Sequence, residues 1–179
     1  MDREIETRCQ KANAVTYQLS PLLKHPSINM AVKRQLINSI FTPTLCYQCQ
    51  TWPLSKTQER KITTCEMRCL RKAVNVTRRD RVRNENIRST VGTTPCIQYI
   101  EKQRIKWFGH LMRMEPHLLP SRAYNNRHSG RRARGRPRTR WIDNISESLR
   151  KHGLTTSSAT QLAQDRKLNL PTTLHGTCG

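Results

Sequence analysis

Arginine, glycine and proline alternate over residues 130–138, which read GRRARGRPR. Glycine and proline keep such a segment extended and narrow, so that its guanidinium groups can enter the minor groove of A·T-rich DNA. The Arg-Gly-Arg-Pro unit at its centre is the core of an AT-hook, but a sequence-independent grip on phosphate and a segment with no binding role are alternatives. The residues expected to contact nucleic acid in and beside this segment are Arg131, Arg132, Arg134, Gly135, Arg136, Pro137, Arg138 and Arg140.

Two more groups of cationic residues point to a polyanionic partner. One group precedes a short predicted helix, and the other follows one side of a long predicted helix, where such charges also occur on ordinary solvated faces. The first group is Arg78, Arg79, Arg81 and Arg83, and the second is Lys102, Lys106 and Arg113. Aromatic residues are few and have core spacing, so contacts to phosphate are favoured over stacking on bases.

Four cysteines have a spacing that resembles a zinc site, namely C-x2-C-x15-C-x3-C from Cys46 and Cys49 to Cys65 and Cys69. The second pair lies one turn apart on the inward face of a predicted helix, where cysteine is a common small apolar residue. The six histidines form no H-x3-H or H-E-x-x-H pattern. Zinc is therefore the less favoured interpretation, and no cofactor is expected for this chain.

Acidic residues do not have the grouping that metal-dependent phosphoryl transfer requires. The aspartates are Asp2, Asp80, Asp143 and Asp165, and no two of them are close in sequence. The phosphate-binding patterns GxxxxGK[ST] and GxGxxG are both absent from the sequence. No catalytic residue is predicted.

The elements that position these groups are predicted to be helices. Apolar residues recur every three or four positions over 5–23 and over 30–41. We expect Ser27 to cap the second of these helices, which should end before Pro43. Ser55-Lys56-Thr57-Gln58 has the spacing of a capping box and predicts a third helix to about Val74.

A short basic helix is predicted within 78–92, ending at Gly92. A long helix follows from Pro95 to about Glu115, with Ile105, Phe108 and other apolar residues on one side and the lysines on the other. Arg104 falls on the apolar side, where it must extend to solvent or pair with Glu101.

Residues 116–142 contain eight arginines and no acidic residue, which predicts an extended basic linker. Two short helices should follow, one over 141–153 and one that Ser157 or Ser158 could cap. The predicted fold is mainly α: a small helical bundle over 1–116, a disordered Arg-rich linker over 117–140, a short helical segment over 141–168 and a disordered tail over 169–179.

The amino-acid composition also favours a polyanionic partner. The 179 residues carry 33 Lys and Arg against 12 Asp and Glu, for a net charge of +21, and Leu, Ile, Val and Phe make up about one fifth of the chain. No stretch approaches the ~18 to 20 apolar residues of a membrane helix, and the first residues lack a signal-peptide core. We therefore expect no membrane partner, an intracellular protein and reduced thiols among the seven cysteines.

Several short segments occur in an order that carries a family resemblance. They are PTLCY at 43–47, TW at 51–52, EMRCLR at 66–71, RDRVRNE at 79–85, RIKWFGHLMRM at 104–114, GRPRTRWID at 135–143 and LAQDR at 162–166. Together they resemble the C-terminal part of LINE-type (non-LTR) retrotransposon endonuclease/reverse transcriptases, and the resemblance covers nearly the whole chain. It ends near Asn169, where the family usually has Trp, and this departure suggests a frameshifted or decayed copy.

The resemblance implies a helical, thumb-like region and a post-thumb region, which hold the template-primer in that family. The endonuclease and the Mg²⁺-dependent palm would lie before Met1, so this chain alone is expected to be inactive. The long helix would lie near the duplex, the linker would help to grip RNA or target DNA, and the expected location is the nucleus. An AT-hook-type DNA-binding or chromatin protein and a non-functional retroelement relic are the alternative interpretations.

Overall fold

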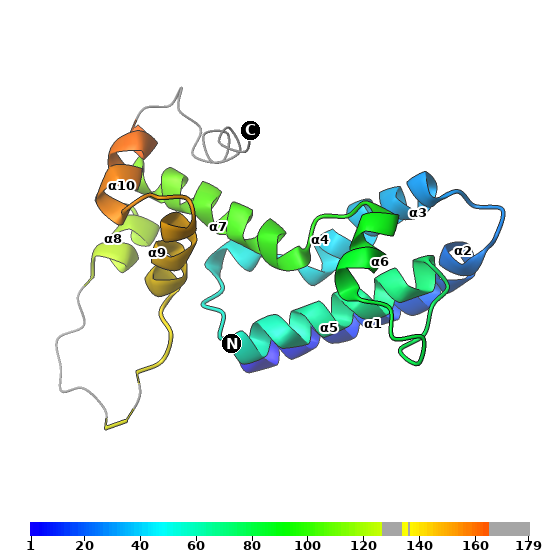
Figure 1. Cartoon of the computed structure of the whole chain (residues 1–179). Helices are drawn as coiled ribbons and strands as arrows, with labels where there is room; N and C mark the ends of the chain where they lie inside the picture. Colours follow the sequence, from blue (N-terminus) through cyan, green and yellow to red (C-terminus); the bar gives the residue numbers. More distant parts are fainter. Residues whose placement is uncertain (127–133, 136, 165–179) are drawn as a thin grey trace. The chain divides into compact units, whose positions relative to one another are not determined.

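The computed structural model describes residues 1–126, 134–135 and 137–164, and within these ranges every regular element is a helix (Figure 1). The predicted mainly α fold is confirmed. The chain divides into two compact units. Unit 1 comprises Met1–Cys49 and Ser55–Ile100, and unit 2 comprises Gln50–Leu54 and the residues from Glu101 onward. The division therefore falls inside the long helix predicted for this region, and not at residue 116.

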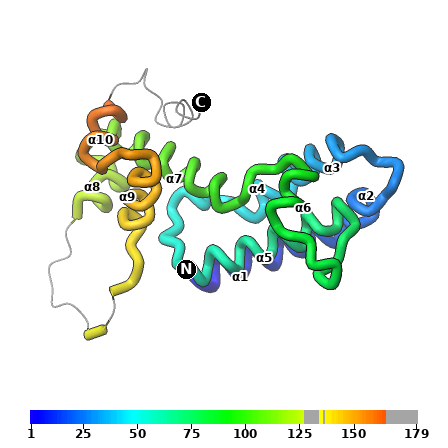
Figure 2. The backbone as a smooth tube through the Cα atoms, viewed as in Figure 1, coloured from blue at the N-terminus to red at the C-terminus, as the bar shows by residue number. Residues whose placement is uncertain are grey.

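Two parallel helices, α1 (Asp2–Gln18) and α5 (Lys56–Ala73), pack against each other in unit 1 (Figures 1 and 2). The capping box at the start of α5 is confirmed, because the Ser55 hydroxyl accepts from Gln58 N and Gln58 Oε1 accepts from Ser55 N. The Gln58 amide also donates to Asp2 at 2.8 Å. This cap thus fixes the register of α5 against the first turn of α1.

The N-terminal part of unit 1 also contains helices α2 (Ser20–Lys24), α3 (Met30–Leu36) and α4 (Thr42–Leu45). Two predictions for this region are wrong, one about the start of α3 and one about Pro43. The cap of α3 is Asn29 and not Ser27, because the Asn29 side chain accepts from Val32 N at 2.9 Å.

The helical path also continues through Pro43 instead of ending before it. A π-helical turn over Ile37–Phe41 joins α3 to α4 and changes the hydrogen-bond register. Pro43 consequently lies in the first turn of α4, directly after the π-helical turn, and the first turn of a helix is a position that tolerates proline.

Helix α6 (Asn84–Val91) ends as predicted at Gly92, which has a left-handed φ of +72°. A Cβ at this position would meet only the end of the exposed Arg34 side chain, so it is the backbone conformation that favours glycine. Helix α7 (Cys96–Met112) follows, and it is slightly shorter than the predicted Pro95–Glu115.

Unit 2 packs α7 against α8 (Leu119–Asn125), α9 (Trp141–Lys151) and α10 (Thr156–Gln164). Its core consists of Ile105, Phe108, Ile145, Leu149, Ala159 and Ala163. Helix α9 agrees with its prediction. The cap of α10 differs, because Thr155 Oγ1 accepts from Ser158 N and the Ser158 hydroxyl accepts from Thr155 N.

Helix α8 lies in the stretch predicted to be a linker, so that part of the linker prediction is wrong. The Tyr124 ring packs edge-on against Phe108 and against Trp141, with centroid distances of 6.4 Å in both pairs. These contacts give α8 an apolar side despite its basic surroundings. The predicted disorder over 127–133, at 136 and over 169–179 lies outside the described residues, as does 165–168, the end of the predicted helical segment.

The short segment Gln50–Leu54 is held in unit 2 by side chains of α9. Asn144 Oδ1 accepts from Leu54 N at 2.8 Å, and Asn144 Nδ2 donates to Leu54 O at 3.0 Å. Trp141 Nε1 donates to Gln50 O at 2.7 Å. Because Trp52 and Leu54 are buried, we name this segment the buried strap.

Asn144→Ala is expected to lower the free energy of unfolding of unit 2 by about 2 kcal/mol, because both Leu54 backbone groups lose their buried partner. All three tryptophans of the chain lie in unit 2, so urea unfolding followed by tryptophan fluorescence measures this effect. Asn125→Ala, at an exposed position of the same unit, should change stability by no more than ~0.5 kcal/mol. Equal losses in the two variants would contradict the role given to Asn144.

Candidate nucleic-acid interface

A turn over residues 77–83 joins α5 to α6, and we name it the arginine turn. The Asp80 carboxylate accepts from Thr77 N at 2.6 Å and from the Thr77 hydroxyl at 3.0 Å. These two hydrogen bonds lower the pKa of Asp80, the backbone one more strongly. Arg81 has a left-handed φ of +52°, and Asn75, shortly before the turn, has a φ of +56°. The chain therefore reverses within a few residues, and the turn has an internal structure that its sequence encodes locally.

Four predicted binding residues, Arg78, Arg79, Arg81 and Arg83, lie on the arginine turn, and all four are exposed. Within the described ranges none of them forms an ion pair with an acidic side chain. Their neighbour Asp80 uses its carboxylate on Thr77. The turn thus presents several guanidinium groups to solvent within a short length of backbone.

The basic side of α7 is the second predicted surface, and it belongs to unit 2. Lys102 and Lys106 are exposed, whereas Phe108 on the opposite side is fully buried, as predicted. Arg104 does not extend to solvent, since it is only 2 % exposed. The side chain of Arg113 donates to Ala163 O at 2.8 Å, near the end of α10. Arg113 therefore satisfies a carbonyl in the last turn of a helix, and fewer of its N–H donors are left for a ligand.

The structure describes part of residues 130–138, which we name the Arg-Gly segment. Arg134, Gly135, Pro137 and Arg138 are exposed, while Arg131, Arg132 and Arg136 lie outside the described residues. Gly135 has a φ of +112°, and nothing lies within 4 Å of the position that its Cβ would occupy. This glycine is therefore open to solvent on the side where a side chain would project.

Arg140 has a structural contact that its sequence pattern did not predict. Its guanidinium donates to Asp143 at 2.9 Å, and its backbone N–H donates to the same carboxylate at 2.8 Å. Both contacts lower the pKa of Asp143, the guanidinium one more strongly. Arg140 and Asp143 together cap the first turn of α9, so this arginine is less available to a ligand than Arg138.

The four cysteines of the predicted zinc spacing are all buried. Cys65 donates to Cys9 O and Cys69 is hydrogen-bonded to Thr16, while Cys46 is hydrogen-bonded to Cys96. Burial raises the pKa of Cys69 to about 12. Within the described part of the chain, no group of three or more ligand side chains is placed to hold a metal ion. The structure does not assemble Cys46, Cys49, Cys65 and Cys69 into one centre.

Glu66 was not predicted to be a key residue, yet it connects three helices of unit 1. Its side chain is 3 % exposed and accepts from Arg88 of α6 at 2.8 Å and from the backbone N–H of Cys96 at 3.0 Å. Cys96 is the first residue of α7, so the carboxylate also faces the positive end of that helix. The signal in the sequence was an acid at helical spacing between Ile62 and Leu70.

No protein-family model, curated protein sequence or solved structure matches this chain. The resemblance to LINE-type reverse transcriptases therefore depends on the ordered segments of the sequence itself. Across residues 1–126 and 137–164, no helix has the length and apolar character needed to cross a membrane.

Proposed function

We propose that this chain binds nucleic acid through the phosphate backbone, with the arginine turn as its principal contact. The observation that carries this proposal is the exposure of Arg78, Arg79, Arg81 and Arg83 beside a single acid that is hydrogen-bonded to Thr77. Guanidinium groups bind phosphate with paired N–H donors, and they lose less hydration than an ammonium group does. The net charge of +21 adds a long-range attraction to any polyanion.

We also propose an origin for this activity. The ordered segments from PTLCY to LAQDR support descent from the thumb and post-thumb region of a LINE-type reverse transcriptase. The all-helical build of the described residues and the exposed Lys102 and Lys106 are consistent with such a region. On this proposal the chain holds DNA or RNA without carrying out polymerisation, and it acts in the nucleus.

The proposal predicts a strong dependence of binding on salt. The full chain should bind a fluorescent duplex with an affinity that falls linearly on a log–log plot against salt, by about 0.9 units of slope for each phosphate neutralised. Fluorescence anisotropy over a series of NaCl concentrations measures this slope. A duplex, an RNA–DNA hybrid and a single strand give the preference among nucleic acids. Binding that does not change with salt would contradict the proposal.

A competition between A·T-rich and G·C-rich duplexes separates this proposal from the AT-hook alternative. Backbone binding predicts similar affinities for the two duplexes. A preference for A·T-rich DNA that disappears in Arg136→Ala would favour minor-groove binding by the Arg-Gly segment.

A further inference from the structure

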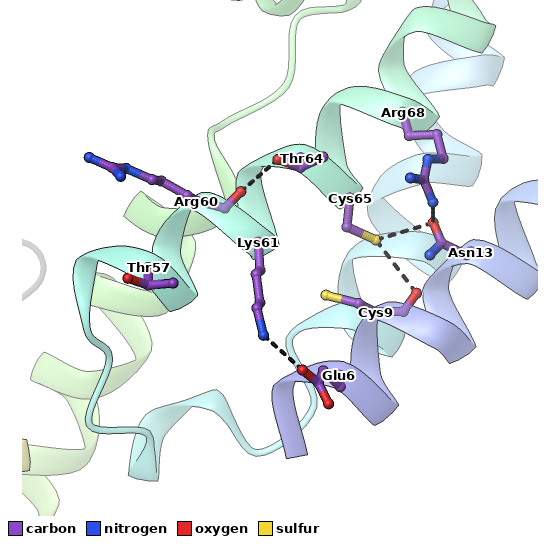
Figure 3. A pocket seen from close by; sticks show the side chains of 9 residues that line it. All are labelled: Glu6, Cys9, Asn13, Thr57, Arg60, Lys61, Thr64, Cys65 and Arg68. Atoms are coloured by element: carbon purple, nitrogen blue, oxygen red, sulfur yellow. Dashed lines mark hydrogen bonds and ion pairs between the residues drawn. The ribbon is translucent and has the colours of Figure 1, made fainter. Parts of the chain in front are cut away.

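A cavity of about 390 Å³ lies between α1 and α5 in unit 1 (Figure 3). Its wall includes two cysteines, Cys9 from α1 and Cys65 from α5. The cationic side chains Lys61 and Arg68 come from α5 as well, and Glu6 is the acid at its edge. A volume of this size is within the range of about 300–1,000 Å³ that is common for small-molecule sites.

The two thiols are direct neighbours across the helix pair. The Cys65 sulfur lies 3.7 Å from the backbone oxygen of Cys9 and 3.6 Å from Asn13 Oδ1 (Figure 3). Interaction between the two thiols shifts the pKa of each in opposite directions. Cys65 is 3 % exposed, whereas Cys9 is only partly buried, and both are free thiols. A reagent in the cavity therefore reaches Cys9 first.

The surroundings favour the thiolate at Cys9 and the thiol at Cys65. The interaction with Cys65 lowers the pKa of Cys9, and Lys61 and Arg68 act in the same direction against burial and Glu6. The same interaction and burial raise the pKa of Cys65. Such an asymmetry is typical of an attacking cysteine beside a resolving cysteine.

We propose that Cys9 and Cys65 form a redox-active dithiol and that the cavity between α1 and α5 admits a small anionic disulfide of the glutathione disulfide class. Among the cations that line the cavity, Arg60 and Arg68 match the carboxylates of such a compound, while Lys61 is paired with Glu6 at 2.8 Å. The site is independent of the arginine turn and of nucleic-acid binding.

The reaction proceeds in two thiol–disulfide exchanges. The Cys9 thiolate attacks one sulfur of the small disulfide, a Cys9 mixed disulfide forms, and one thiolate leaves and takes up a proton from water. In the mixed disulfide Cys9 has lost its negative charge, which was one of the causes that raise the pKa of Cys65. Cys65 loses its proton to water and attacks the Cys9 sulfur, which releases the second small thiolate, and this thiolate takes up a proton from water. Two protein thiols are oxidised to one disulfide, and the small disulfide is reduced to two thiols.

Peptide mapping of the full chain tests this proposal. The reduced protein is incubated with glutathione disulfide, quenched with acid, digested with trypsin without reductant and analysed by mass spectrometry. We expect a disulfide-linked pair of peptides, Cys9–Lys11 with Ile62–Arg68. Cys65→Ser should instead accumulate a glutathione adduct on Cys9, because the resolving thiol is missing.

Cys69→Ser is the matched control, because Cys69 is buried one turn along the same helix but does not line the cavity. It should give the Cys9–Cys65 disulfide at the rate of the unmodified sequence. Circular dichroism of each variant shows that the helices are retained. As a test without substitution, iodoacetamide should label Cys9 fastest among the six described cysteines. A Cys9 that stays reduced, pairs with another cysteine or reacts no faster than the others would overturn the proposal.

Discussion

Glu66→Ala is expected to lower the free energy of unfolding of unit 1 by about 3 kcal/mol, because it removes one partner of a buried ion pair. Arg88 then keeps its charge at a site where its side chain is 17 % exposed, and Cys96 N loses its acceptor. The fall in melting temperature should be about 15 °C for a unit of this size. Thermal unfolding followed by circular dichroism measures it.

Two further variants separate the charge from the hydrogen bond. Glu66→Gln keeps an oxygen that can accept from Cys96 N but loses the charge that faces Arg88, so its stability should be intermediate. Glu85→Ala removes an exposed acid from the first turn of α6 and should cost no more than ~0.5 kcal/mol. If Glu66→Ala were no less stable than Glu85→Ala, the buried pair would have no role in holding unit 1 together.

The combined replacement of the four arginines of the arginine turn by glutamine is expected to weaken binding to a duplex by about a hundredfold or more at moderate salt. The log–log salt slope should also become shallower, by up to about 0.9 units for each arginine replaced. The folded structure should be retained, because Arg78, Arg79, Arg81 and Arg83 are exposed and Asp80 and Thr77 still form the turn. Anisotropy titrations with the same duplex measure both quantities.

A control with the same change in net charge distinguishes the turn from charge in general. Arg3, Lys11, Lys24 and Arg60 are exposed residues of unit 1 outside the turn, and they can be replaced by glutamine together. The control should lose much less affinity, and its salt slope should stay close to that of the unmodified chain. Equal losses in the two fourfold variants would mean that overall charge, and not the arginine turn, determines binding.

The features that the sequence predicted well depend on residues close together along the chain. The capping box at Ser55 and Gln58 and the left-handed Gly92 are of this kind, since each helix end is set by its own few residues. Exposure of the arginine-turn residues followed from their local charge density. The predicted cap at Ser27 failed even so, because Asn29 lies closer to the first turn of α3.

The features that the sequence did not reveal depend on distant partners. Helix α8 is stabilised by the packing of Tyr124 against Phe108 and Trp141, and no local sequence pattern indicates those contacts. Glu66 meets residues 22 and 30 positions away. For the same reason the sequence did not show which predicted binding residues are already engaged. Arg113, for example, donates to Ala163, which lies 50 positions away. A count of cationic residues alone overestimates how many are free to bind.

The buried strap has a consequence for how the chain is made. Its last residue, Leu54, precedes Asn144 by 90 positions, which is roughly 5 to 20 s of synthesis. Trp52 and Leu54, which are buried in the folded chain, therefore leave the ribosome long before α9, whose side chains bind the backbone of the strap. During that interval two large apolar side chains are open to chaperones and to neighbouring nascent chains. Assembly of unit 2 is thus a late event of translation, although its first residues are made early.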